Sequence, residues 1–114
     1  QEDESNRLAA QKLDAAIASA RDQIFSILQK EKIIRRHFDN DFPDGMAEDV
    51  AFVKEDFDRL QEHRKKLQSA LNNDYSGLNT TQINIATEEI EYQAQDLAKI
   101  LERICKRMPT LCEE

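Results

Sequence analysis

Residues 6–39 read NRLAAQKLDAAIASARDQIFSILQKEKIIRRHFD, and this stretch decides the fold class. Apolar or small side chains recur in it at alternating intervals of three and four positions, the spacing of one face of a helix. The recurring positions are Ala10, Leu13, Ile17, Ala20, Ile24, Ile27, Glu31, Ile34 and Phe38. The stretch therefore predicts a long amphipathic helix whose apolar seam has one charged break, at Glu31.

Two further stretches repeat this alternation. The second seam consists of Met46, Val50, Val53, Phe57, Leu60, Arg64, Leu67 and Leu71, again with one charged break. The third consists of Ile83, Thr87, Ile90, Ala94, Leu97, Leu101, Ile104 and Met108. Turn residues separate the seams, and Asp44 is well placed to cap the second helix.

The pattern predicts an all-α fold, either an antiparallel three-helix bundle or a coiled-coil helical hairpin. We expect a single domain at residues 6–108, with helices at about 6–39, 46–73 and 80–108. An acidic tail at residues 1–5 and a second tail at residues 109–114 flank it.

The first and second helices can pair antiparallel with position numbers that add to about 84. This register sets Ile27 beside Phe57, and it sets the charged break at Arg64 beside the small residue Ala20. In such a place Arg64 serves register or partner choice, so we expect Arg64→Leu to be neutral or stabilising. The first helix is the longest, so its first turns, around Leu8 to Leu13, should overhang the bundle.

The charge balance argues against several partners. The formal net charge is -7, and the longest basic run is Arg64-Lys65-Lys66. An acidic rod is repelled by nucleic-acid phosphates and by anionic lipid surfaces. The sequence also lacks an apolar run near the roughly 20 residues that a membrane helix needs. We therefore expect no nucleic acid as a partner and no membrane insertion.

We find no motif for catalysis, so we expect no enzyme activity, no cofactor and no small-molecule substrate. A zinc site would need His37 and His63 together, and the predicted bundle separates them along its length. Residues 39–50 begin like a calcium loop, but Val50 stands where the final glutamate is needed. A charged helix surface explains the acidic clusters.

Cys105 and Cys112 would lie about 10 Å apart on a continuous helix, which is too far for a disulfide. A bridge needs the chain to fold back after Pro109, and we expect free thiols in a reducing compartment. We accordingly predict an intracellular location, such as the cytoplasm. Asn79-Thr80-Thr81 matches the N-glycosylation sequon, but we interpret Asn79, Thr80 or Thr81 as a helix cap.

Residues 42–108 resemble the helical, coiled-coil region of central-channel FG nucleoporins. The resemblance is carried by Phe42-Pro43, by Asp49, Val53, Asp56, Phe57 and Leu60, and by Ala94-Gln95-Asp96-Leu97-Ala98. It implies a scaffold segment of the nuclear pore complex, located at the nuclear envelope, that assembles with other nucleoporins and serves protein transport. The chain has no Phe-Gly dipeptide, so binding of transport receptors is not implied.

The sequence is compatible with two functional hypotheses, both of them non-enzymatic. The first is a structural scaffold segment that assembles with partner helices, as in the nuclear pore. The alternative is a free-standing three-helix adaptor, such as a spectrin-like repeat, a syntaxin N-terminal bundle or a chaperone-cofactor bundle. The partners are other helical proteins or a second copy of the chain. The predicted partner-binding residues are Leu8, Leu13, Ile17, Glu31 and Arg64.

Overall fold

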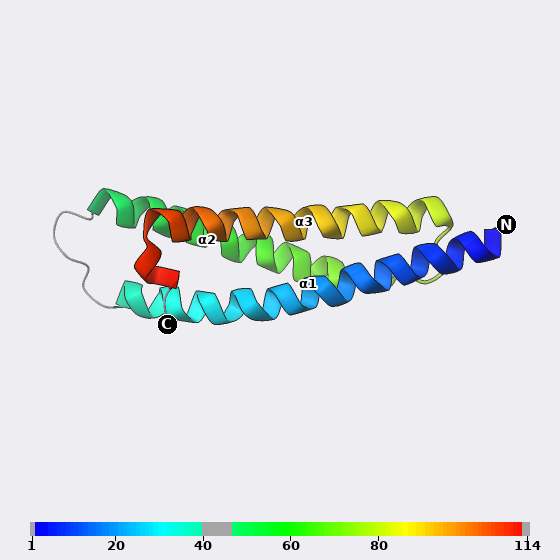
Figure 1. The fold of residues 1–114 in the computed structure, drawn as a ribbon, viewed down its shortest axis with the longest axis horizontal. Helices are drawn as coiled ribbons and strands as arrows, with labels where there is room; N and C mark the ends of the chain where they lie inside the picture. The colour runs from blue at the N-terminus through cyan, green and yellow to red at the C-terminus, as the bar shows by residue number, and fades with distance from the viewer. Residues whose placement is uncertain (1, 40–46, 113–114) are drawn as a thin grey trace.

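The computed structural model describes residues 2–39 and 47–112, and it confirms the all-α three-helix bundle. The helices, shown in Figure 1, are α1 (Glu2–Asp39), α2 (Ala47–Leu71), α3 (Thr80–Arg107) and the short 3-10 helix η1 (Pro109–Cys112). The connection at 40–46, with the predicted cap Asp44, lies outside the described residues. Among the described helices, none is long and apolar enough to cross a membrane.

The described chain forms a rod. Its extents are 64 × 21 × 19 Å, and its radius of gyration is 17.6 Å. A compact chain of this length would have a radius of gyration of about 13 Å. Figure 1 shows α2 running antiparallel to α1 and α3, so that α1 and α3 are parallel to each other. The long helices therefore set the shape, and the core is a narrow column along the axis.

The predicted seam residues that the structure describes form most of this core, although Ala9 is buried and the predicted Ala10 is only half-buried. The largest fully buried side chains are Ile27, Ile34, Val53, Leu60, Leu67, Ile90, Leu97, Ile104 and Leu111. Each such side chain contributes about 1.5–3 kcal/mol through removal from water. On α3 the buried face also includes Ile100, whereas the seam residues Ala94 and Leu101 are only half-buried. A helix that contacts two neighbours buries a wider stripe than a two-helix seam, which explains this difference.

The predicted register of α1 against α2 is wrong. Arg64 lies beside Glu31 rather than Ala20, which moves its partner from position 20 to position 31. In the same register Phe57 packs against Phe38, with ring centroids 5.5 Å apart. The shift of 11 residues is close to three whole helical turns at 3.6 residues per turn. The same face of α1 therefore stays buried, while each residue meets a partner three turns away.

The turns of α1 around Leu8 to Leu13 do not overhang the bundle as predicted. Helix α1 includes residues 2–5, which were predicted to be a tail, and it lies beside the start of α3, where Asn6 contacts Thr80. Leu13 is 4% exposed and belongs to the core. The overhang was expected because α1 is longest. The parallel packing of α1 and α3 covers these turns instead.

The tail after α3 is also ordered, and the prediction of free thiols is wrong. Cys105 and Cys112 form a disulfide, with their Cα atoms 5.7 Å apart. The backbone N–H of Met108 makes the last hydrogen bond of α3, to the oxygen of Ile104. Helix η1 begins at Pro109 and turns back toward α1. Leu111 is fully buried there. Burial of this side chain and a hydrogen bond from Lys30 Nζ to the Cys112 backbone oxygen at 3.0 Å both support the fold-back that the bridge needs.

Replacing Phe57 with alanine should lower the free energy of unfolding by about 3–5 kcal/mol, because it removes a buried ring and leaves a cavity. Chemical denaturation followed by circular dichroism measures the loss. Phe25→Ala is the matched control, since Phe25 is 65% exposed and its loss should change stability by less than about 0.5 kcal/mol. Equal effects of the two variants would contradict the assigned core.

Replacing Cys105 and Cys112 together with serine should lower stability by about 2 kcal/mol, because the bridge closes a short loop in the unfolded chain. Thermal denaturation with and without a thiol reductant measures this difference. The reductant should destabilise the native chain and leave the double variant unchanged. Two thiols that react with an alkylating reagent in the native, unreduced protein would contradict the bridge.

Candidate protein-interaction surface

A groove runs between the parallel helices α1 and α3. Its main part encloses about 500 Å³. The α1 wall includes Ala15, Ala16 and Ser19, and the α3 wall includes Ala94 and Ala98. These short side chains stand beside the apolar seams and leave open space between the two helices. We call this surface, together with its continuation toward Cys105, the α1/α3 groove.

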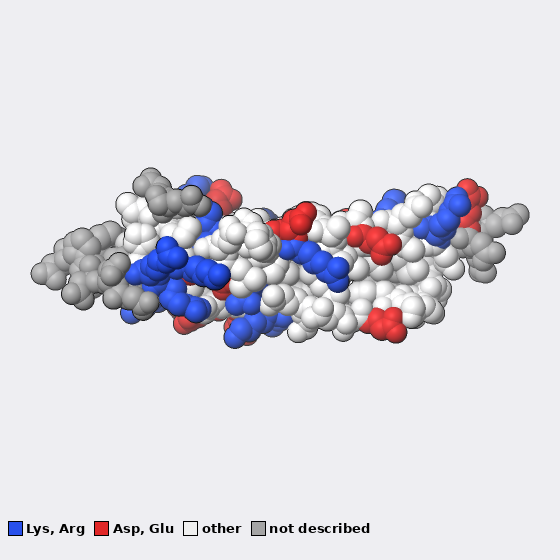
Figure 2. Space-filling model, turned by 90° about the horizontal axis from the view of Figure 1, so that it is seen from below, with Lys and Arg blue, Asp and Glu red and all other residues white. Residues whose placement is uncertain are grey.

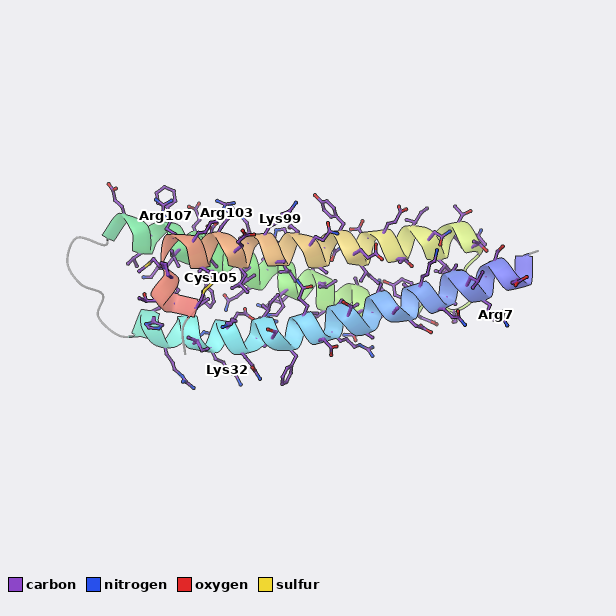
Figure 3. All side chains as sticks on the ribbon, viewed as in Figure 1. Arg7, Lys32, Lys99, Arg103, Cys105 and Arg107 are labelled. Carbon is purple, nitrogen blue, oxygen red and sulfur yellow. A yellow bond between two sulfur atoms is a disulfide. The ribbon has the colours of Figure 1, made fainter. Side chains whose placement is uncertain are left out.

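The groove continues toward the C-terminal end of α3. A second hollow of about 310 Å³ is lined by Ile27, Leu101 and Cys105, among others. The two hollows share Gln23 and Ala98 as lining residues, so they are adjacent along the helices. The α1/α3 groove therefore extends from the first half of α1 to the tail disulfide, which Figure 3 shows as a yellow bond beside Cys105.

Gln23 fixes the two walls relative to each other. Its Nε2 atom donates a hydrogen bond to the backbone oxygen of Ala94, at 2.5 Å. This bond joins α1 and α3 at the point where the two hollows meet. Because a backbone oxygen accepts it, the contact depends on the position of α3 and not on the side chain of Ala94. The width of the groove is thereby held at its centre.

Charged residues also line the α1/α3 groove. Lys12 and Glu91 line the main hollow, and Glu102 lines the second. Glu102 also pairs with Lys106 at 3.8 Å. The lining of the main hollow therefore combines short, largely apolar side chains with a few charged ones. An amphipathic helix can lay its apolar side into such a groove.

The predicted partner-binding residues do not form one surface. Leu8 is 51% exposed, and Ile17 is half-buried against the core. Leu13 and Glu31 are buried, and Arg64 is bonded to Glu31. The structure thus brings together only the two charged breaks, and it does so inside the bundle. Contact of Leu8 with a partner stays a prediction.

The α1/α3 groove was missed because its walls are alanine and serine. The signal in the sequence is the small-residue run Ala15-Ala16-Ile17-Ala18-Ser19-Ala20, followed far along the chain by Ala94 and Ala98. A seam analysis counts large apolar side chains and passes over small ones. Only the parallel arrangement of α1 and α3 reveals that the two sets face each other.

The pair of Glu31 and Arg64 is the most buried ion pair among the described residues. Arg64 Nε donates to Glu31 Oε2 at 2.6 Å, and Arg64 Nη2 donates to Oε1 at 3.3 Å. Arg64 Nη1 also donates to Gln68 Oε1 at 2.8 Å. The Glu31 side chain is 4% exposed and that of Arg64 is 12% exposed. The two-pronged geometry satisfies both carboxylate oxygens away from water.

This geometry changes the expectation for Arg64. Arg64→Leu alone should cost about 3–5 kcal/mol of unfolding free energy, because it leaves the Glu31 carboxylate buried and unpaired. The double variant Glu31→Leu with Arg64→Leu should be neutral or more stable than the native chain. Urea denaturation at neutral pH measures both. A single variant as stable as the native chain would show that the pair is not buried in solution.

Basic side chains gather at one end of the rod, as Figure 2 shows over the C-terminal part of α1. Lys32, Arg35 and Arg36 are exposed there. Positive charge at a helix C-terminus is stabilised by the helix dipole. Figure 3 shows Lys99 and Arg103 of α3 on the opposite side of the rod from Lys32. The two basic groups thus do not share a face, and the helix dipole favours only Arg36, which lies in the last turn of α1.

His63, Asp96 and Asp74 take part in structural contacts among the described residues. His63 Nδ1 lies 2.8 Å from Asp96 Oδ2, between α2 and α3. The pKa of Asp74 is lowered, because the hydroxyl and the backbone N–H of Ser76 both donate to its carboxylate. Within the described ranges, no three His, Cys, Asp or Glu side chains are grouped as metal ligands. These contacts organise helix packing and the turn before α3.

No family model matches the chain, and no curated protein or solved structure matches it either. The nucleoporin resemblance therefore stays a prediction from the sequence. Inference about the role of the chain has to start from the geometry of the bundle and of the α1/α3 groove.

Proposed function

We propose that the chain is a free-standing three-helix module that binds an amphipathic helix of a partner protein in the α1/α3 groove. The observation that carries the proposal is the groove itself, walled by Ala15, Ala16, Ser19, Ala94 and Ala98. The short side chains of the walls let the partner helix approach α1 and α3 closely, and the charged lining residues fix its orientation.

The bundle supports a free-standing module because its seams already cover one another. Ile34, Leu60, Leu97 and Ile104 are buried within the single chain. The charged breaks also pair with each other and do not need a second chain. A scaffold segment that assembles only with partner helices would leave its seams open when alone. The nuclear pore scaffold is thus the less favoured hypothesis, and it depends on the sequence resemblance alone.

The charged residues that line the groove indicate which charges the partner helix should carry. Glu91 and Glu102 line the α3 side, and Lys12 lines the α1 side. A partner helix with Lys or Arg facing α3 would complement the two carboxylates. Its apolar side would need small or medium residues at intervals of three and four to follow the groove.

The disulfide bears on where the module works. Free thiols were the basis for the predicted intracellular location, and Cys105 and Cys112 are instead joined. Disulfides persist in oxidising compartments and are rare where glutathione keeps thiols reduced. We therefore favour an oxidising compartment, such as the secretory pathway, as part of this proposal.

A substitution that fills the α1/α3 groove tests whether the partner binds there. Ala98→Arg places a long cationic side chain at the junction of the two hollows and should abolish partner binding. Ala51→Arg is the matched control, since Ala51 is an exposed alanine on α2, away from the groove. Both variants should melt within a few degrees of the native chain, because surface substitutions change stability by about 0.5 kcal/mol or less.

The measurement has two parts. Sedimentation equilibrium of the chain alone should give a 13.2 kDa monomer at micromolar concentration. Affinity capture from the native source should then recover a protein that binds the native chain and Ala51→Arg, but not Ala98→Arg. Reconstitution with that purified protein completes the test. A partner that binds all three chains equally would contradict the α1/α3 groove as the binding site. An unfolded monomer would contradict the proposal that the module is free-standing.

A further inference from the structure

The turn between α2 and α3 carries the sequon Asn79-Thr80-Thr81 on an exposed surface. We propose that Asn79 is a site of N-linked glycosylation, with an oligosaccharide on its side-chain amide. From the sequence alone a helix cap was a sufficient interpretation, because glycosylation requires a secreted chain. The structure adds two observations that favour glycosylation as well: the environment of the amide and the state of the cysteines.

The oxygen and the nitrogen of the Asn79 side-chain amide have different roles. Its Oδ1 atom accepts a hydrogen bond from the backbone N–H of Gln82 at 2.8 Å, which caps α3. The Gln82 side chain returns a contact by accepting from the Asn79 backbone N–H at 3.1 Å. Within the described part of the chain, Nδ2 donates no hydrogen bond. The nitrogen that would carry the sugar is therefore left to solvent.

Capping and glycosylation are thus compatible. In the transfer, Nδ2 forms a bond to the anomeric carbon of an oligosaccharide carried on a lipid pyrophosphate. The bond from that carbon to the pyrophosphate oxygen breaks, and the pyrophosphate leaves with the electron pair. One amide proton passes to a base of the transferase. Oδ1 keeps its lone pairs, so the modified side chain still accepts from Gln82 and the helix start is preserved.

The surroundings leave room for a bulky group. Asn79 lies in extended backbone, with φ -80° and ψ 171°, just before the first turn of α3. The preceding turn is polar and exposed at Asn72, Asn73, Asp74 and Ser76. Figure 1 shows this turn at the end of the rod that also holds the N-terminus, away from η1. An oligosaccharide there would project from the end of the rod.

The cysteines supply the independent observation. The disulfide between Cys105 and Cys112 indicates an oxidising compartment. Disulfide formation and transfer of oligosaccharides to asparagine both act on chains that enter the secretory pathway. The inference shares this compartment with the proposed function and does not depend on the α1/α3 groove. If the partner does not bind in the groove, the glycosylation proposal still stands. If Asn79 carries no glycan, the proposed groove still stands.

Peptide mapping of the protein from its native source tests the site. Trypsin should release residues 67–99 as one peptide, because Lys66 and Lys99 bound a stretch without Lys or Arg. Asn79-Thr80-Thr81 is the only sequon in the sequence. We expect this peptide to carry a glycan. After an amidase that cleaves glycans from asparagine, in heavy-oxygen water, labelled aspartate should appear at position 79 alone. Recovery of the peptide with unmodified asparagine at position 79 would overturn the proposal.

Variants of the full chain, secreted from eukaryotic cells, separate the modification from the fold. Thr81→Ala should remove the glycan, and the matched Thr81→Ser should keep it, because the acceptor sequence takes either hydroxyl. Asn79→Asp should also remove the glycan while keeping the helix cap. A glycan that persists in Asn79→Asp, or a native chain secreted without one, would overturn the assignment.

Discussion

The bond between Glu31 and Arg64 is the constraint on which the arrangement of the helices depends. Each group is a charge taken out of water, and each is costly to bury unless the other neutralises it. Sliding α1 along α2 by a few turns would keep apolar faces in contact, but it would leave a carboxylate and a guanidinium in the core without partners. The apolar seams hold the helices together, and the ion pair decides where along their length they meet.

This division explains what could be predicted from the sequence. The helices and their buried faces follow from local periodicity, and a helix cap at Asn79, Thr80 or Thr81 follows from the polar run before α3; the structure selects Asn79. The register does not, because Ile27, Ile34, Val53 and Leu60 are similar in size and a seam repeats itself after every few turns. The decisive information was the opposite charge of the two breaks, which the predicted register overlooked when it set Arg64 beside Ala20.

The tail and the α1/α3 groove escaped prediction because both depend on segments distant in sequence. Pro109 marked the end of α3 correctly, but the closing of the disulfide depends on burial of Leu111 and on the hydrogen bond from Lys30 to the Cys112 oxygen at 3.0 Å. The groove arises where alanines of α1 face alanines of α3. Small side chains carry little hydrophobic signal, so their importance emerges only from the packing.

The odd number of long helices has a geometric consequence. Figure 1 shows α1 beginning at one end of the rod and η1 finishing near the other. A chain of two or four antiparallel helices would bring its termini back to the same end. Here, any polypeptide continued from both termini would be strung along a line, with the 64 Å rod acting as a stiff spacer between its neighbours.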